Sequence, residues 1–174
     1  TIERIMFWTK LKSKEVLGQI LTLVEKGEFD QALKLGKSSG QPIARVLAAG
    51  LAHRNPAPAK AMEAAAQAEI PVLKSRIGVL DTIVTLAPLL GLLGTVVGMI
   101  GSFDVMSEAG LGQPHAVTGG VAEALIATAT GLLIAILTLI SYNYFTGRVE
   151  RELDQMEHFS SSLELLLHEH AGKH

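Results

Sequence analysis

The strongest constraint on how this chain can fold is the distribution of its charges. Between Ile77 and Gly147 there is no Lys or Arg, although the chain contains 15 of these residues. Acidic residues in this region are few, namely Asp81, Asp104, Glu108 and Glu123. Because charged side chains are unfavourable inside a bilayer, a region this long and this poor in charge is typical of a membrane-embedded segment.

Two uncharged runs within this region, residues 82–103 and 124–145, are each 22 residues long. A helix needs about 20 apolar residues to cross a bilayer, so both runs are long enough. The sequence therefore predicts membrane helices at 77–103 and 116–147. They are joined by a loop at 104–115, "DVMSEAGLGQPH", which contains glycine, proline and polar residues.

The basic residues predict the orientation of this hairpin. Twelve Lys or Arg precede residue 77, three follow residue 147, and the connecting loop has none. Because Lys and Arg are enriched on the cytoplasmic side, we expect a multi-pass protein with a cytoplasmic N-terminal domain and C-terminal tail. The 104–115 loop then faces the periplasm.

Residues 10–76 are predicted to form a small cytoplasmic helical domain, so the fold class is all-α. Helices are expected at 13–26, with Ser13 as N-cap, and at 28–37, 42–53 and 57–70. The last of these is expected to continue through a kink at Pro71 into the first membrane helix.

The residues after the hairpin, 148–174, are predicted to continue the second membrane helix as an amphipathic helix. Apolar residues recur at helical spacing at Val149, Leu153, Met156, Leu163 and Leu167, and Ser160 fills the gap in the series. Such a face needs a partner surface to cover it.

The first nine residues are interpreted as the cytoplasmic end of an upstream membrane helix that is largely missing from this sequence. Phe7 and Trp8 precede Lys10 and Lys12, and this order of aromatic and basic residues is typical of a membrane border. The alternative is a soluble N-terminal helix.

Four glycines in the first membrane helix recur at steps of three, four and three: Gly91, Gly94, Gly98 and Gly101. On a helix they form one stripe. Small residues in membrane helices allow backbones to approach closely, so this stripe is predicted to be a helix-packing face. In the second helix, a similar stripe comprises Ala124, Thr128, Gly131, Ala135 and Thr138.

A second, more polar stripe lies about 100° around the first helix. It consists of Asp81, Thr85, Pro88, Leu92, Thr95, Met99 and Ser102. One interpretation is a face turned to water or to a polar partner helix. The other is that the threonine hydroxyls bond to carbonyls of their own helix.

Glu123 is the most costly residue of the second helix, because a carboxylate near the bilayer centre is unfavourable by roughly 2.5–3.5 kcal/mol. It is interpreted as a charge or proton site in a polar channel. The alternative is a hydrated position in the outer interface, or a protonated carboxyl bonded to a neighbour. Glu123 and Thr128 lie about 140° apart around the helix, which argues against a simple two-residue relay.

The two membrane helices resemble those of the MotA/TolQ/ExbB proton-channel family. The resemblance rests on "APLLGLLGTVVGMIGSF" and "GGVAEALIATATGLLIAI", and "GEFDQALKLGKSSGQPIARVLAAGL" resembles the cytoplasmic region of ExbB and TolQ. The ExbB branch fits best, and the match covers about residues 27–145. Pro71 departs from the family pattern.

This resemblance implies a function and a set of site residues. It implies a pentameric ring in the bacterial inner membrane, around a single-span partner of ExbD or TolR type. The ring would drive a TonB- or TolA-like protein with the proton motive force. The resemblance also implies pore positions at Thr95, Thr128 and Glu123, while the proton-carrying aspartate belongs to the partner.

Other function classes find little support in the sequence. The net charge of −2 offers no basic surface for nucleic acid, and the chain contains no cysteine for thiol chemistry. Neither membrane helix contains His, and there is no HExxH motif, so we expect no enzyme, cofactor or metal site. "HEH" at 168–170 is interpreted as solvated. A passive oligomeric membrane scaffold stays open as an alternative.

Overall fold

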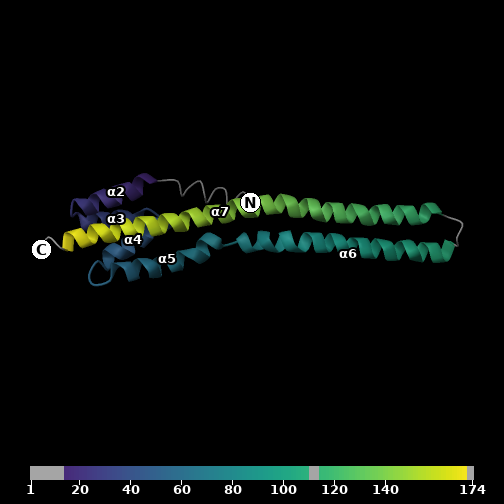
Figure 1. Ribbon diagram of the computed structural model, residues 1–174, viewed down its shortest axis with the longest axis horizontal. Coiled ribbons are helices and arrows are strands. Elements are labelled where there is room, and N and C mark those ends of the chain that lie inside the picture. Colours follow the sequence, from purple (N-terminus) through teal and green to yellow (C-terminus); the bar gives the residue numbers. More distant parts are fainter. Residues whose placement is uncertain (1–13, 110–113, 172–174) are drawn as a thin grey trace. The chain divides into compact units, whose positions relative to one another are not determined.

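The computed structural model describes residues 14–109 and 114–171, and within these ranges the chain is helical with no strand (Figure 1). The all-α prediction is confirmed for this part of the chain. The predictions for residues 1–9 and for Ser13 lie outside the described residues. The helices are α2 (Lys14–Glu25), α3 (Phe29–Ser38), α4 (Pro42–Ala52), α5 (Pro58–Lys74), α6 (Ile77–Ala109) and α7 (Pro114–Ala171).

The helices form two compact units, with boundaries at residues 75/76 and 146/147. One unit, which we call the bundle, contains α2 to α5 and the last part of α7 from Gly147 onward. The other, which we call the hairpin, contains α6 and the first part of α7. Each unit is described by itself below.

Helix α4 forms the centre of the bundle. Eight of its 11 residues are buried, and it contacts α2, α3 and α5. The sequence explains this position, because "PIARVLAAGLA" is apolar almost all round, as a buried helix must be. Around it, α2 contributes Leu17, Ile20 and Val24, which are fully or almost fully buried.

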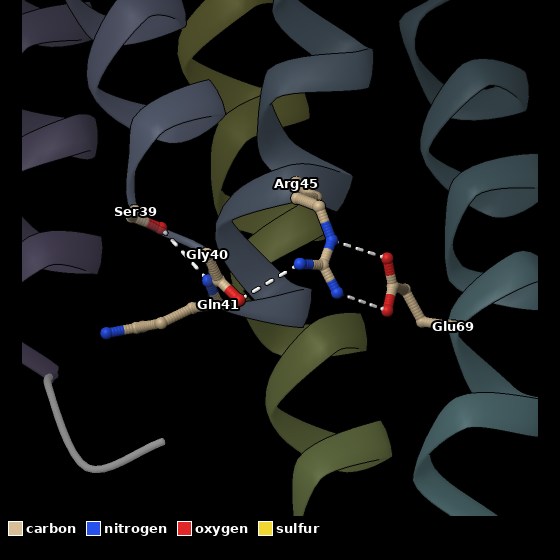
Figure 2. A network of polar contacts seen from close by, with 5 residues as sticks. All are labelled: Ser39, Gly40, Gln41, Arg45 and Glu69. Carbon is tan, nitrogen blue, oxygen red and sulfur yellow. Dashed lines mark hydrogen bonds and ion pairs between the residues drawn. The ribbon is translucent and has the colours of Figure 1, made fainter. Parts of the chain in front are cut away.

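Arg45 ties three parts of the bundle together (Figure 2). Its Nε and Nη2 atoms donate to the two carboxylate oxygens of Glu69 on α5, at 2.7 and 2.6 Å. Its Nη1 atom donates to the carbonyl of Gly40, in the turn before α4, at 2.9 Å. The hydrogen bonds that Arg45 donates to Glu69 raise the pKa of Arg45, although partial burial opposes this effect. Arg45 thus holds α4, the preceding turn and α5 in one arrangement.

The connection between α5 and α6 differs from the prediction of one kinked helix. Pro71 lies inside α5, which continues to Lys74, so the proline does not end the helix. The helix stops at Ser75, whose backbone is extended, and Arg76 has a positive φ of 64°. A positive φ is uncommon for a residue with a Cβ, and no glycine marks this break in the sequence.

The end of α7 supplies the last wall of the bundle. Val149, Met156, Leu163 and Leu167 are buried there, so the apolar face predicted for the tail is covered by other helices of the same unit. Near the end of α7, the ring of His170 lies edge-on to Phe29 of α3, with centroids 5.5 Å apart.

The hairpin consists of two helices that are long and apolar enough to cross a membrane, by length and composition. They run side by side in Figure 1. The most apolar stretch of 18 residues is only 11% buried in α6 and 17% buried in α7. Most large apolar side chains of these stretches therefore point away from the other helix. A core helix of a soluble protein would instead be mostly buried, and this exposure therefore fits helices surrounded by lipid.

The hairpin helices extend further than the sequence predicts. Residues 104–109 were expected in the loop, but α6 continues to Ala109, and α7 begins at Pro114. The reason is local, because the first glycine after Phe103 is Gly110 and nothing before it interrupts a helix. Proline at the start of α7 suits the first helical turn, where its missing N–H is not needed.

Candidate functional site

Glu123 lies on α7 and lines a groove of the hairpin with a volume of about 560 Å³. Among the described residues that line the groove it is the one charged residue, and most of the others are small or apolar. They are Gly94, Val97, Gly98, Gly101, Ser102, Val105, Gly120 and Ala127. We call this the Glu123 groove. The glycines leave room beside the carboxylate that larger side chains would fill.

Ser102 is the second polar side chain of the Glu123 groove. It is 3% exposed, and its hydroxyl donates to the carbonyl of Gly98 at 2.8 Å. A Cβ on Gly120 of α7 would collide with this hydroxyl. Ser102 therefore lies between the two helices, where its neighbour has to be glycine, although the sequence placed it on a polar stripe facing away from the glycines.

Thr128 joins the two hairpin helices. Its hydroxyl donates to the carbonyl of Gly91 on α6 at 3.1 Å. A Cβ on Gly91 would lie 3.1 Å from the Cα of Thr128, so the glycine permits the approach that brings donor and acceptor together. Between membrane helices such hydrogen bonds contribute about 0.6 kcal/mol on average.

The hydroxyl of Thr95 bonds within its own helix, donating to the carbonyl of Leu92 at 2.6 Å. Thr85 behaves in the same way, donating to the carbonyl of Asp81 at 3.0 Å. These bonds agree with the alternative interpretation of the polar stripe. They use the hydroxyl proton, but each oxygen keeps lone pairs that can accept a bond from another group.

The three residues predicted to form the pathway are not brought together within one chain. Glu123 lines the groove, Thr128 bonds across the helix interface, and Thr95 lines neither of the two grooves described for the hairpin. A site that uses all three therefore needs groups from outside this chain.

Three glycines of the predicted packing stripe lie against α7. A Cβ on Gly94 would lie 2.6 Å from the Cβ of Ala127, and one on Gly98 would lie 2.9 Å from that of Ala124. Gly91 faces Thr128, as described above. Among the described residues, Gly101 has no such neighbour within 4 Å, so it takes no part in this close packing.

The matching surface on α7 consists of small residues at steps of four, three and four: Gly120, Ala124, Ala127 and Gly131. Sequence reasoning identified Ala124 and Gly131 in a different stripe and missed Gly120 and Ala127. The tightest approach to the backbone of α6 is at Gly131, where a Cβ would lie 2.5 Å from the carbonyl oxygen of Ala87. A search for small residues at these steps would have found the set.

A second groove of the hairpin differs from the Glu123 groove in chemistry. Its volume is about 520 Å³, and no charged residue lines it. Its lining consists of Thr82, Ile83, Leu86, Ala87, Leu90, Gly91, Ala127, Thr130, Gly131 and Ile134. A carboxylate is thus present in one of these two grooves and absent from the other.

The described residues contain no group of three or more His, Cys, Asp or Glu that could hold a metal ion. Beside the Glu123 groove, the groups available for chemistry are the carboxylate of Glu123 and the hydroxyl of Ser102. Such groups can accept, hold and pass a proton or a small cation.

Comparison with known proteins identifies the family. The family described as "MotA/TolQ/ExbB proton channel family" matches residues 38–158, a range that includes α4, α5, α6 and most of α7. The chain belongs to this proton-channel family. The resemblance seen in the sequence is confirmed, and both hairpin helices lie inside the matched region.

Individual relatives come from two branches of the family. A biopolymer transport protein named ExbB-like 3, from Synechocystis, is 35% identical over 95% of this chain and 82% of its own length. The Tol-Pal system protein TolQ of Haemophilus influenzae is 37% identical over 64% of this chain and 49% of its own length. The biopolymer transport protein ExbB of Aquifex aeolicus is 38% identical over 47% and 55%.

Proposed function

We propose that this chain is the ring-forming subunit of an inner-membrane motor of the ExbB–ExbD type. The motor uses the proton motive force to energise TonB-dependent transport across the outer membrane. Several copies, five by family analogy, surround the membrane helix of a single-span partner of ExbD or TolR type. Family membership and the similarity to an ExbB-like protein over 95% of the chain support this proposal.

The observation that carries the proposal is the position of Glu123. It is the one acidic residue between Ala116 and Val149, and it lines a groove walled by glycines rather than pointing into a packed helix interface. A carboxylate is energetically unfavourable inside a bilayer, so the presence of Glu123 indicates that it has a function. In the ring, we place the Glu123 groove toward the central, hydrated space.

Thr95 and Thr128 are proposed to act with a carboxyl group of the partner. The Thr95 oxygen, already donating to Leu92, can accept a bond from a protonated partner carboxyl. Thr128 is proposed both to hold the hairpin together through Gly91 and to line the pathway where the partner passes. The partner thus supplies the group that unites residues that one chain keeps apart.

The proton motive force supplies enough free energy for such a mechanism. Moving one charge across 100 mV releases about 2.3 kcal/mol, which exceeds the average contribution of one hydrogen bond between membrane helices. A proton that enters and leaves the partner carboxyl can therefore exchange one set of hydroxyl contacts for the next around the ring.

The wider assembly follows from the same proposal. The protein is placed in the bacterial inner membrane, with the bundle in the cytoplasm. A TonB- or TolA-like protein receives the output. No nucleic acid, metal or organic cofactor takes part, and the chain itself is not an enzyme.

A TolQ-type role is the second candidate, because a TolQ protein matches the chain at 37% identity. The partner would then be of TolR type and the driven protein of TolA type. A passive scaffold is the third candidate, since the small residues already explain the packing of the hairpin. A scaffold, however, has no need for Glu123.

The test is proton flux in proteoliposomes that contain the chain together with its copurifying single-span partner. We expect Glu123→Gln to lower proton flux at least tenfold, because the amide keeps the shape but cannot ionise. Thr95→Val should lower flux less, since it removes only one hydroxyl. Glu150→Gln, an exposed carboxylate of the bundle, is the matched control.

Two results would decide between the candidates. Unchanged flux in an assembled Glu123→Gln complex would contradict the motor and favour the scaffold. The identity of the copurifying partner, ExbD-like or TolR-like, would distinguish the ExbB role from the TolQ role.

A further inference from the structure

The bundle contains a groove between α5 and the last part of α7, with a volume of about 430 Å³. We call it the α5–α7 groove. Its floor is apolar, since Met62 and Met156 lie there with 2% exposure each. Its other lining residues are Ala59, Glu63, Ala66, Gln67, Leu153, Glu157, Ser160, Ser161 and Glu164.

The charge of this groove has one sign. Three carboxylates line it, those of Glu63, Glu157 and Glu164, and none of the described Lys, Arg or His residues does. The ion pair between Arg45 and Glu69 lies outside this groove. Like charges around one cleft raise the local concentration of cationic ligands, so the groove favours an apolar segment that carries positive charges.

We infer that the α5–α7 groove binds the basic cytoplasmic segment of the single-span partner. The apolar floor would take an aliphatic or aromatic side chain of that segment, and the three glutamates would pair with Lys or Arg on either side of it. This inference rests on the proposed function, because that function supplies the partner and places the bundle in the cytoplasm.

The partner is the occupant that general membrane physics favours. A single-span protein inserted in the same membrane carries its excess of Lys and Arg on the cytoplasmic side, which is the side proposed for the bundle. The groove starts at Leu153, eight residues after the second apolar run ends at Phe145. One helical residue adds about 1.5 Å and one extended residue about 3.3 Å. A partner segment on the order of ten residues is therefore long enough to reach the groove.

The floor of the groove suits a flexible ligand. Methionine side chains are unbranched and adapt to different shapes. Met62 has room for its position because residue 50 on α4 is glycine; a Cβ there would lie 2.6 Å from the Met62 Cγ. The groove is therefore supported from below by α4, the buried centre of the bundle.

The experiment is site-specific photo-crosslinking in membranes that contain the full chain and its copurifying single-span partner. A photoreactive phenylalanine replaces Ser161, at the exposed edge of the groove, and the crosslinked peptide is mapped by mass spectrometry. We expect crosslinks to the Lys- and Arg-rich cytoplasmic segment of the partner. The triple variant Glu63→Gln, Glu157→Gln and Glu164→Gln should lower their yield at least fivefold.

A matched triple variant controls for net charge. Glu25→Gln, Glu150→Gln and Glu169→Gln remove the same number of exposed carboxylates outside the groove, and should leave the yield within about twofold. Equal yields in the two triple variants would overturn the inference. So would crosslinks that map to a second copy of this chain, or only to uncharged parts of the partner.

A separate variant distinguishes failure of this inference from failure of the proposed function. Glu123→Gln should lower proton flux at least tenfold but leave the crosslink unchanged. If the crosslink is missing but Glu123→Gln lowers proton flux, the docking inference alone is overturned. If the crosslink forms but Glu123→Gln leaves proton flux unchanged, the motor is overturned and the docking inference stands.

Discussion

The bundle and the hairpin are both helical, but their helices pack by opposite rules. In the bundle, large apolar side chains such as Leu47, Leu51 and Leu163 are buried, and charged residues lie outside. In the hairpin, glycine and alanine fill the interface, while large apolar residues such as Leu90 and Leu125 are exposed.

The difference follows from the solvent on each side. Water drives large apolar side chains together, but lipid does not, because its tails are as apolar as leucine. Membrane helices associate through close backbone contact, which only small residues allow. A carboxylate such as Glu123 therefore stands out in the hairpin, whereas the bundle surface holds many.

The largest expected effect is the difference in stability lost when a leucine is shortened to alanine in each of the two units. Leu47→Ala should destabilise the bundle by about 2–5 kcal/mol, because it leaves a cavity in a packed core. Leu90 is 64% exposed in the hairpin, and Leu90→Ala should change stability little. Thermal unfolding of both variants in the same detergent, followed by circular dichroism, measures the contrast, and equal losses would refute the comparison.

The next effect is the change in hairpin stability when a glycine of α7 is replaced by alanine. Gly131→Ala should destabilise the hairpin by about 1–3 kcal/mol, because the added methyl group meets the Ala87 backbone and the helices must move apart. Gly119 on the same helix has no neighbour within 4 Å among the described residues, so Gly119→Ala should be neutral or slightly stabilising. Resistance of the purified protein to unfolding in SDS measures both. Similar behaviour of the two variants would contradict the proposed interface.

The smallest effect concerns Glu152, a half-buried carboxyl of the bundle. Burial raises its pKa above the usual value, and the nearby charge of Arg148 partly opposes this shift. A raised pKa means that the folded state holds the proton of Glu152 more tightly than the unfolded state does. Proton binding at Glu152 therefore adds to the free energy of unfolding below the unfolded-state pKa, and this contribution is lost as pH rises through the folded-state pKa. Glu152→Gln should therefore raise the melting temperature more at pH 7 than at pH 4. Melting temperatures of the variant and of the unaltered protein at the two pH values measure this difference. Glu150→Gln, at an exposed position, is the control.

Much of the fold could be predicted from the sequence because charge and helical periodicity determine it. The absence of Lys and Arg between 77 and 147 marks the hairpin, and the steps of Val149, Met156 and Leu163 mark the buried face of α7. The break at Ser75 and Arg76 could not be predicted, since neither residue type is a helix breaker. The kink was predicted at Pro71, but α5 continues past this residue to Lys74.

The candidate site was harder to predict than the fold. Periodicity assigned Ser102 to an open polar face, but its small side chain fits between Gly98 and Gly120. The hydroxyl of Thr95 bonds to its own helix, a possibility that the sequence left open. Which side of a helix faces a central pore depends on other copies of the chain, and a single sequence does not contain that geometry.

The most direct test of the central claim is the water accessibility of Glu123 in the assembled protein. Because the chain has no cysteine, a single introduced cysteine can be labelled without background by a water-soluble, membrane-impermeant thiol reagent. The account predicts that Glu123→Cys reacts at least tenfold faster than Leu125→Cys, which lies at nearly the same depth and is 64% exposed on the same helix. Equal and slow labelling at both positions would place Glu123 against lipid and contradict the account.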